Sequence, residues 1–353
     1  MPAYYKIESD NLTRFIIDIL VQTDIAPGQA VIIADTLVRA DLRGINSHGM
    51  IRFPFYVKRL LDGGTKVNPN FSIERESIAT AVFNGDNGMG QIVTYQAMNL
   101  AINKAKKAGI AYITINNSNH FGIASYYAMQ ALEHDMIGIV WSNGPSNMAP
   151  WGGSSRVIGN NPLAVAIPAG ERDPIVLDIS MGKVAGGKVR LAAKEGKKIP
   201  KDWIISKEGR VTDDPEDLPD GGALMALGHK GYGLAIVGEV LSGVLSGAGL
   251  LTQIPMWFKA TGQATNIGHM VMTINIEDFM ETVVFKKRVD YLIDELKASK
   301  LAAGYDEILV PGEIEVRKER EQLQDGIELP ARIIDELDQM AQDFQVPAIK
   351  RVD

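Results

Sequence analysis

The first third of the chain carries apolar residues at helical spacing. Leu12 and Ile16 lie on the same face of a helix expected over residues 11–23. A second helix is expected over residues 27–42, because Gly44 supplies a natural stop after its last apolar turn. A loop then leads into a third helix that ends near the glycine pair at residues 63–64.

Short runs of β-branched and aromatic residues follow, and helical patterns alternate with them. Helices are expected over residues 91–108 and 125–134. This alternation predicts an α/β fold. The expected strands are residues 71–75, 80–84, 111–115, 137–141, 163–167, 175–177 and 270–276.

The stretch from Ala111 to Ser125 organises the rest of the chain. It begins as a buried strand, breaks into small polar residues and resumes as a helix at Ser125. His120 therefore lies in a strand-to-helix connection, which is where open α/β sheets hold their ligands. A histidine there can exchange a proton near neutral pH. The alternative is a capping or core-edge histidine whose nitrogens bind backbone groups.

Three further strands end in, or begin from, loops rich in Gly, Asn, Ser and Pro. These loops comprise residues 142–153, 159–162 and 178–180. Backbone N–H groups and side-chain amides at such a rim suit a polar ligand that carries sugar and phosphate groups. Lys230 is expected at the amino terminus of a glycine-rich helix, where an anion would bind.

Composition narrows the class of protein. A chain of 353 residues predicts one large domain or two interleaved domains. Its net charge of -7 disfavours nucleic-acid and anionic-membrane partners, because no basic excess exists to neutralise phosphates. The absence of cysteine excludes disulfides, thiolate metal sites and a cysteine nucleophile, and it favours the cytoplasm.

Two local compositions have structural explanations. The basic run at residues 183–201 is typical of a solvated helix face, with a phosphate-bearing cofactor as the lesser alternative. The most apolar window, residues 233–251, contains Glu239 and five glycines, which favours a buried, closely packed helix over a membrane span.

The five histidines divide into two groups. His134 and His269 are expected at the surface or at edges, whereas His48, His120 and His229 lie in glycine-bearing loops. No HxH or HExxH spacing links them, so no metal site is predicted. No GxSxG motif supports a serine hydrolase either.

Arg52 follows Ser47 and His48 by about one turn, and Tyr56 lies on the same helix face one turn later. The planar guanidinium of Arg52 could bind a substrate carboxylate through two parallel hydrogen bonds. The alternative is a surface salt bridge.

Five short motifs together resemble the type 2 malate/L-lactate dehydrogenase family. Relatives in that family include ureidoglycolate dehydrogenase, sulfolactate dehydrogenase, diketogulonate reductase and the Δ1-piperideine-2-carboxylate reductases. The motifs appear in the family's order, and the resemblance covers nearly the whole chain. They are residues 44–49 with Arg52, 119–122, 149–153, 159–162 and 229–234.

The resemblance implies an α/β fold that is not the Rossmann fold, in agreement with the missing dinucleotide fingerprint at residues 85–90. This is the sulfolactate dehydrogenase-like type 2 fold, with a helical N-terminal part and a central mixed-sheet cofactor domain. The implied domains are a substrate-side domain, residues 1–118 joined by 300–353, and a cofactor-binding domain, residues 119–299. A homodimer with the active site near the subunit interface is also implied.

By the same resemblance, the chain is an NAD- or NADP-dependent 2-hydroxyacid dehydrogenase acting on a small carboxylate substrate. His120 would be the acid/base, and Ser47 and His48 would contact the reacting oxygen and the nicotinamide. Arg52 would bind the substrate carboxylate and Tyr56 would line the pocket. The implied cofactor contacts are His48, Gly144, Asn160, Asn161, Pro162, Asp178, Ile179, Ser180, Lys230, Gly231, Gly312 and Glu313.

Three alternatives stay open at this point. One is an NADPH-dependent reductase of cyclic imino acids on the same scaffold, and the others are a metal-assisted lyase and a catalytically silent dinucleotide-binding protein.

The family's usual Gly-Thr-Asn-Pro motif is Gly-Asn-Asn-Pro at residues 159–162. Asp178 and the basic segment 183–188 offer one acidic and one basic candidate near the adenosine ribose, so the choice between NAD and NADP is open.

Overall fold

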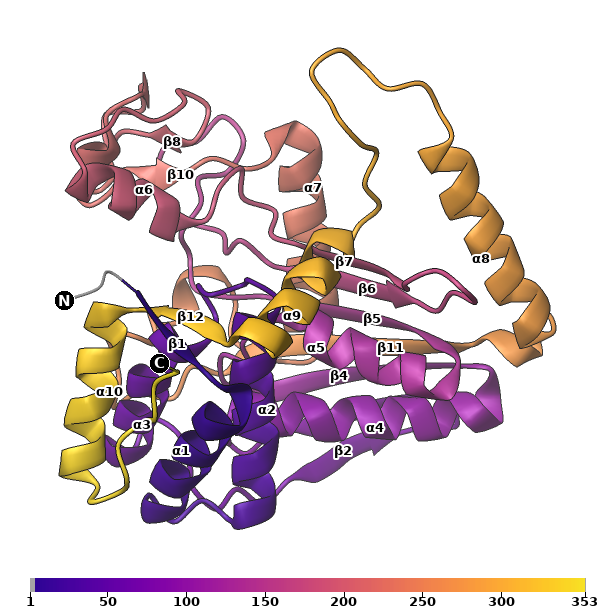
Figure 1. The fold of residues 1–353 in the computed structure, drawn as a ribbon, viewed down its shortest axis with the longest axis horizontal. Helices are drawn as coiled ribbons and strands as arrows, with labels where there is room; N and C mark the ends of the chain where they lie inside the picture. The colour runs from indigo at the N-terminus through magenta and orange to yellow at the C-terminus, as the bar shows by residue number, and fades with distance from the viewer. Residues whose placement is uncertain (1–3, 353) are drawn as a thin grey trace.

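A seven-stranded mixed sheet lies at the centre of the fold, in the order β2-β3-β4-β11-β5-β6-β7 (Figure 1). The computed structural model describes residues 4–352; residues 1–3 and 353, at the two ends of the expected substrate-side domain, lie outside the described residues. Only β3 and β4 pair in parallel, and the other neighbours in the sheet are antiparallel. The strands are β2 (Ser72–Glu76), β3 (Thr80–Asn84), β4 (Ile110–Ser118), β5 (Met136–Ser142), β6 (Leu163–Ile167), β7 (Ile175–Ile179) and β11 (Ile267–Asn275).

The register of the sheet gathers the polar loops at one end. On one side of β11, Ile267 lies opposite Ser118; on the other, His269 lies opposite Ser142. Leu163, the first residue of β6, pairs with both β5 and the end of β7. The segments that follow β4, β5 and β7 therefore open beside those that precede β6 and β11.

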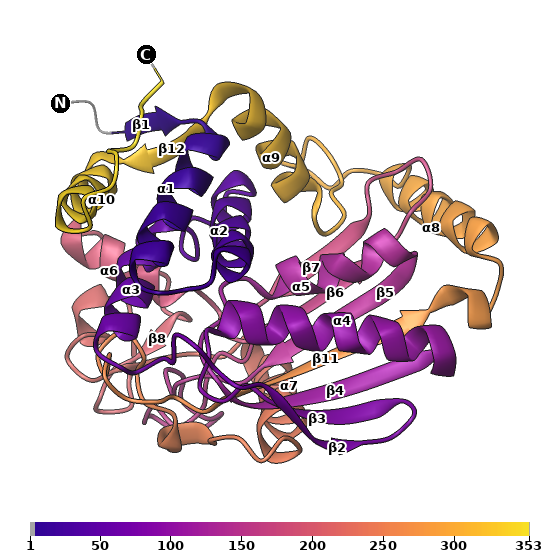
Figure 2. The same cartoon turned by 90° about the horizontal axis from the view of Figure 1, so that it is seen from below.

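Helices cover both faces of the sheet, as the alternation of its side chains requires. Val140 and Val271 point into the core formed with α4 (Gly90–Ala108) and α5 (Ala124–Gln130). The neighbouring Trp141 and Met270 point to the other face and pack with α7 (Gly228–Gly238). Figure 2 shows α4 and α5 on one side of the strands.

A helical unit packs beside the sheet and joins the two ends of the chain. The amphipathic faces of its helices form one core, which includes Leu12, Ile33 and Leu337. Pro54 lies in the first turn of α3, where its missing N–H is tolerated. The elements of this unit are β1 (Tyr4–Ile7), α1 (Ser9–Gln22), α2 (Pro27–Leu42), α3 (Phe53–Leu61), β12 (Ile327–Pro330) and α10 (Ala331–Asp343), and β1 pairs with β12.

The expected domain division at residue 118 passes through the sheet. The strands β2, β3 and β4 precede this position, yet they belong to the same sheet as β5, β6, β7 and β11. The helical core nevertheless combines both ends of the chain, with Ile7 and Ile334 in one cluster.

The remaining elements surround this framework. The helix α8 (Thr282–Lys297) and the segment that follows it project from the body in Figure 1. Among residues 4–352, no helix combines the length and the apolar character needed to cross a membrane. The other elements are α6 (Gly186–Lys194), α9 (Glu313–Asp325) and a small sheet of β8 (Ile204–Ile205), β9 (Val211–Thr212) and β10 (Ala223–Leu224).

The expectation of a buried, closely packed helix over residues 233–251 holds for one face of the helix only. This segment forms most of α7 and a π-helical turn, Glu239–Val244, and its small residues face the sheet. A Cβ atom on Gly238 would lie 2.3 Å from the indole nitrogen of Trp141, so only glycine fits there. The large apolar side chains consequently point outward; Val240 is 46% exposed. We refer to the exposed residues Leu234, Ile236, Val237, Val240, Val244 and Leu245 as the α7 outer face.

Candidate active site

Four side chains that the sequence singled out converge in the structure. The imidazole rings of His48 and His120 are stacked, with centroids 5.5 Å apart. The Tyr56 hydroxyl lies 2.6 Å from Nδ1 of His120. Arg52 donates from Nε to the carbonyl oxygen of Ser47 at 2.7 Å, which ties the guanidinium to the same loop.

The loop that carries Ser47 and His48 is fixed by a buried carboxylate. Asp41, near the end of α2, accepts a hydrogen bond from the Met50 amide at 2.7 Å. A Cβ atom on Gly49 would lie 2.1 Å from this carboxylate, so the close approach requires glycine. Burial raises the pKa of Asp41 to about 7. The geometry of the loop that carries Ser47 and His48 therefore depends on a carboxylate to which no cation in the described part of the chain is bonded.

His120 is held from one side. Both the Tyr56 hydroxyl and, at 3.4 Å, the Gly122 amide approach its Nδ1 atom, which leaves Nε2 for a reactant. Burial, followed by the charges of His48 and Arg52, lowers the pKa of His120 well below its usual value. The imidazole is therefore neutral at pH 7 and able to accept a proton.

Trp257 forms a wall of the site that the sequence did not reveal. It is 4% exposed, and its ring stacks on His120 with centroids 4.5 Å apart and on Tyr56 at 5.4 Å. The Arg52 guanidinium lies 5.5 Å from the indole centroid. Trp257 belongs to an irregular segment with no apolar periodicity, so no local pattern marks it.

Several of the expected cofactor residues lie together at the end of the sheet. Gly144 follows β5, residues 160–162 precede β6, and residues 178–180 end β7. A Cβ atom on Gly144 would have no neighbour within 4 Å, so space is open there. The buried Oδ1 of Asn147 has no hydrogen-bond partner among the residues that the structure describes, and a polar ligand would supply one. These loops fit the polar groups of a dinucleotide.

The start of α7 adjoins the same loops. The amide of Leu227 donates to the carbonyl oxygen of Met181, directly after Ser180. A Cβ atom on Gly231 would lie 3.3 Å from that carbonyl oxygen. Lys230 is exposed beside it, so the structure brings residues 230–231 close to the end of β7.

Other expected cofactor residues have protein partners. The Asn161 amide donates to Glu239 at 2.8 Å, and Glu313 forms an ion pair with Lys297 at 2.8 Å. Asp178 accepts a hydrogen bond from the Ser125 amide at 2.9 Å, and burial raises its pKa.

Gly312 lies apart from the polar loops. A Cβ atom on this residue would be 3.0 Å from Val176, near the end of β7 remote from Ser180. The structure therefore does not bring residues 312–313 to the rim formed by Gly144 and its neighbouring loops.

The expectation that His269 lies at the surface or at an edge is wrong. Its side chain is fully buried between the hydroxyls of Ser142, at 2.8 Å, and Ser118, at 2.9 Å. Burial lowers its pKa to about 3, so it stays neutral. The reason is that β11 occupies the middle of the sheet, which the sequence pattern alone does not indicate. His134 is exposed, as expected.

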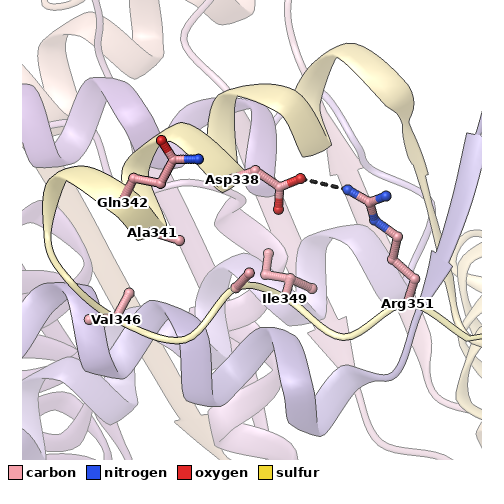
Figure 3. Close-up of a pocket in the computed structure, with 7 residues that line it drawn as sticks. Asp338, Ala341, Gln342, Val346, Ile349 and Arg351 are labelled. Carbon is pink, nitrogen blue, oxygen red and sulfur yellow. Dashed lines mark hydrogen bonds and ion pairs between the residues drawn. The ribbon is translucent and has the colours of Figure 1, made fainter.

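A separate pocket lies between α10 and the C-terminal segment (Figure 3). Its volume is about 400 Å³, and it contains none of the residues above. The pocket lining comprises Asp338, Ala341, Gln342, Val346, Ala348, Ile349 and Arg351.

Within the described part of the chain, no three His, Asp or Glu side chains are grouped as ligands for a metal ion.

Comparison with known proteins gives consistent matches over nearly the full length. Residues 7–338 match the profile of the malate/L-lactate dehydrogenase family. The malate dehydrogenase of Pyrococcus horikoshii is 37% identical and is matched over 96% of this chain and 95% of its own length. The ureidoglycolate dehydrogenase (NAD(+)) of Escherichia coli K12 is 34% identical, with 92% of each chain covered.

The L-sulfolactate dehydrogenase of Methanocaldococcus jannaschii is similar in both sequence and structure. It is 40% identical, with 96% of this chain and 97% of that protein covered. Its solved structure superimposes with a TM-score of 0.92, covering 97% of this chain and 98% of that chain. The fold expected from the sequence is thereby confirmed.

The raised pKa of Asp41 predicts a pH-dependent stability. Between about pH 4 and pH 7 the folded chain keeps a proton on Asp41 that the unfolded chain releases, so this group's contribution to stability decreases as pH rises through that window. The loss is at most about 4 kcal/mol and is complete above pH 7. Asp41→Asn should therefore raise Tm relative to the wild type more at pH 8 than at pH 5.

Thermal unfolding at the two pH values measures this difference. Asp335→Asn, an exposed carboxylate on α10, serves as the matched control and should change Tm little at either pH. An equal Tm difference at pH 5 and pH 8 for Asp41→Asn would contradict the assignment.

Proposed function

Because the chain belongs to the malate/L-lactate dehydrogenase family, we propose that it interconverts a small 2-hydroxy acid and its 2-oxo acid with NAD or NADP. The observation that carries this proposal is the placement of a neutral imidazole, His120, beside the Arg52 guanidinium. Hydride transfer from a 2-hydroxy acid needs a base for the hydroxyl proton and a cation for the carboxylate. The proposed location is the cytoplasm.

His120 is the proposed acid/base. In the oxidation direction, the tautomer whose Nδ1–H donates to the Tyr56 hydroxyl oxygen leaves Nε2 unprotonated, and Nε2 accepts the proton of the C2 hydroxyl. The bound nicotinamide supplies the hydride acceptor. In the reduction direction, the imidazolium returns this proton to the oxygen of the 2-oxo acid. Ser47 and His48, which hydrogen-bond to each other at 2.8 Å, lie on the side of the reacting oxygen and the nicotinamide.

Arg52 is the proposed carboxylate ligand. Its Nε atom is bonded to Ser47, and the two terminal nitrogens remain for parallel hydrogen bonds to a carboxylate. Burial, opposed by Tyr56 and reinforced by the charge of Arg190, lowers the pKa of Arg52, yet a guanidinium stays protonated.

The proposed substrate carries a second acidic group. Arg190 on α6 is exposed, and its positive charge is one of the causes that lower the pKa of Arg52. The relatives named for malate and sulfolactate act on acids with two anionic groups. A 2-oxo acid such as oxaloacetate or 3-sulfopyruvate fits this charge pattern better than pyruvate.

A homodimer is part of the proposal, formed through the α7 outer face. This surface consists of aliphatic side chains with no exposed charge between residues 234 and 245, and such a patch is typical of an interface. It lies on the helix whose amino terminus adjoins the proposed cofactor loops. The resemblance to a dimeric family selects a second copy of this chain as the occupant.

The function is tested by following NADH and NADPH absorbance with a panel of 2-oxo and imino acids. We expect oxaloacetate or 3-sulfopyruvate to be reduced with a higher kcat/KM than pyruvate, and His120→Gln to bind cofactor but lose turnover. Preferred reduction of piperideine-2-carboxylate would favour the imino-acid alternative. Cofactor binding without turnover of any panel member would contradict a catalytic role.

Arg52→Lys tests the carboxylate contact. The ammonium cannot reproduce two parallel hydrogen bonds, so KM for the 2-oxo acid should rise about tenfold or more. Arg14→Lys, an exposed arginine on α1, is the control. A KM equal to that of the wild type would place Arg52 outside the substrate pocket.

Val240→Glu tests the α7 outer face. Light scattering should give twice the mass of one chain for the wild type and a single-chain mass for this variant, because an unpaired charge would be buried in the interface. Val211→Glu changes an exposed valine on β9 and should stay dimeric. A dimeric Val240→Glu protein, or a monomeric wild type, would overturn this part of the proposal.

A further inference from the structure

Arg59 is a buried cation that forms no ion pair with any carboxylate among residues 4–352. It lies on α3, three residues after Tyr56, and is 2% exposed. Burial lowers its pKa to about 10. Removing a charge from water is expensive unless its hydrogen bonds are satisfied, so the partners of this guanidinium define its role.

Those partners belong to three separate segments. The guanidinium donates to the carbonyl oxygens of Trp257 at 3.1 Å, Ala260 at 3.1 Å and Gln263 at 2.9 Å. It also donates to the carbonyl oxygen of Gly64 at 2.6 Å and to Oδ1 of Asn119 at 2.8 Å. One side chain therefore joins α3, the irregular segment 257–263 and the residue that precedes His120.

Asn119 is fixed from several directions. Its Oδ1 atom accepts a second hydrogen bond, from Thr265 at 2.8 Å, and its Nδ2 atom donates to the Gly88 carbonyl oxygen at 2.9 Å. With both ends of this amide bonded, the backbone that leads into His120 has little freedom to shift.

The Trp257 segment forms no helix or strand between Ile254 and Thr265, and its backbone is held by turn hydrogen bonds from Lys259 and Ala260 to Met256 and from Gln263 to Ala260. Arg59 supplies bonds to three carbonyl groups in it, and Trp257 is the residue that stacks on His120 and Arg52. We propose that Arg59 is a positioning residue that holds Trp257 and Asn119 in place around His120. This inference rests on the proposed function, because its consequence is measured in the proposed reaction.

If Arg59 positions Trp257 and Asn119, its replacement should change the pKa of His120, which a loss of overall stability alone would not do. Without the hydrogen bonds from Arg59, Trp257 moves away from His120, and water reaches the imidazole. The pKa of His120 should then rise toward its usual value of about 6.5, and the reacting geometry should loosen. A purely structural arginine would change Tm but would leave the pH profile and kcat as they are.

Arg59→Lys is the direct test, because it keeps the charge and loses the planar fork. We expect NADH affinity within about twofold of the wild type, a kcat about 10- to 100-fold lower, and an acid limb of kcat/KM for hydroxy-acid oxidation displaced toward pH 6.5. The matched control is Arg156→Lys, since Arg156 also donates to two backbone carbonyl groups, those of Gly222 and Leu218. Wild-type kcat and pH profile in Arg59→Lys would overturn the inference.

A second variant covers the case in which Arg59→Lys does not fold. Trp257→Ala keeps the backbone carbonyl that Arg59 binds and removes only the ring. It should show the same fall in kcat and the same displaced limb, and wild-type values would contradict the inference. If the wild-type protein turns over no panel substrate, the proposed function fails. The pKa of His120, compared by NMR in the wild type and Arg59→Lys, then decides the positioning claim.

Discussion

The pairing of β11 between β4 and β5 is the constraint on which the site depends. β11 comes late in the chain but lies at the centre of the sheet, with antiparallel partners on both sides. Its buried His269 bonds to Ser118 at the end of β4 and to Ser142 at the end of β5. This pairing fixes where the His120 loop emerges. It also delivers the segment that carries Trp257 to the same place.

The helical unit brings the second half of the site to this end of the sheet. Tyr56 and Arg59 project from α3 toward His120 and Asn119, and Arg52 is bonded to the loop before them. Positive charge and burial act together there, and both disfavour protonation of His120. An imidazole that is neutral at pH 7 beside a guanidinium suits removal of a hydroxyl proton from an anionic substrate. The neutral His120 ring and the nearby positive charge of Arg52 are therefore both consistent with the proposed removal of a hydroxyl proton.

Local patterns were sufficient for much of this arrangement. The limits of α2, β3 and β6 agree with the expected ranges, because each has a clear apolar period and a nearby breaker. The convergence of His48, Arg52, Tyr56 and His120 was expected from the resemblance to the dehydrogenase family, not from local periodicity, and the structure brings these side chains together. Long-range pairing was the part that could not be predicted. Tyr5 and Leu329 are partners in a short sheet whose strands have four residues each, too short for a distinct period.

Errors arose where tertiary packing overrode a local tendency. The glycines of α7 lie against Trp141, so the apolar side chains of that helix face outward although its composition favours burial. Trp257 and Arg59 are parts of the site that no spacing marks, since these two partners are 198 residues apart in the chain.

An NMR titration of the imidazole of His120 tests the central claim most directly. The chain has five histidines, so selective ¹⁵N labelling and the His120→Gln variant assign the signal. The account predicts a neutral ring at pH 7 with a pKa below 6.5, and a Trp257-dependent chemical shift. A ring that titrates at or above 6.5, or a signal unaffected by replacement of Trp257, would contradict a buried proton acceptor against that indole.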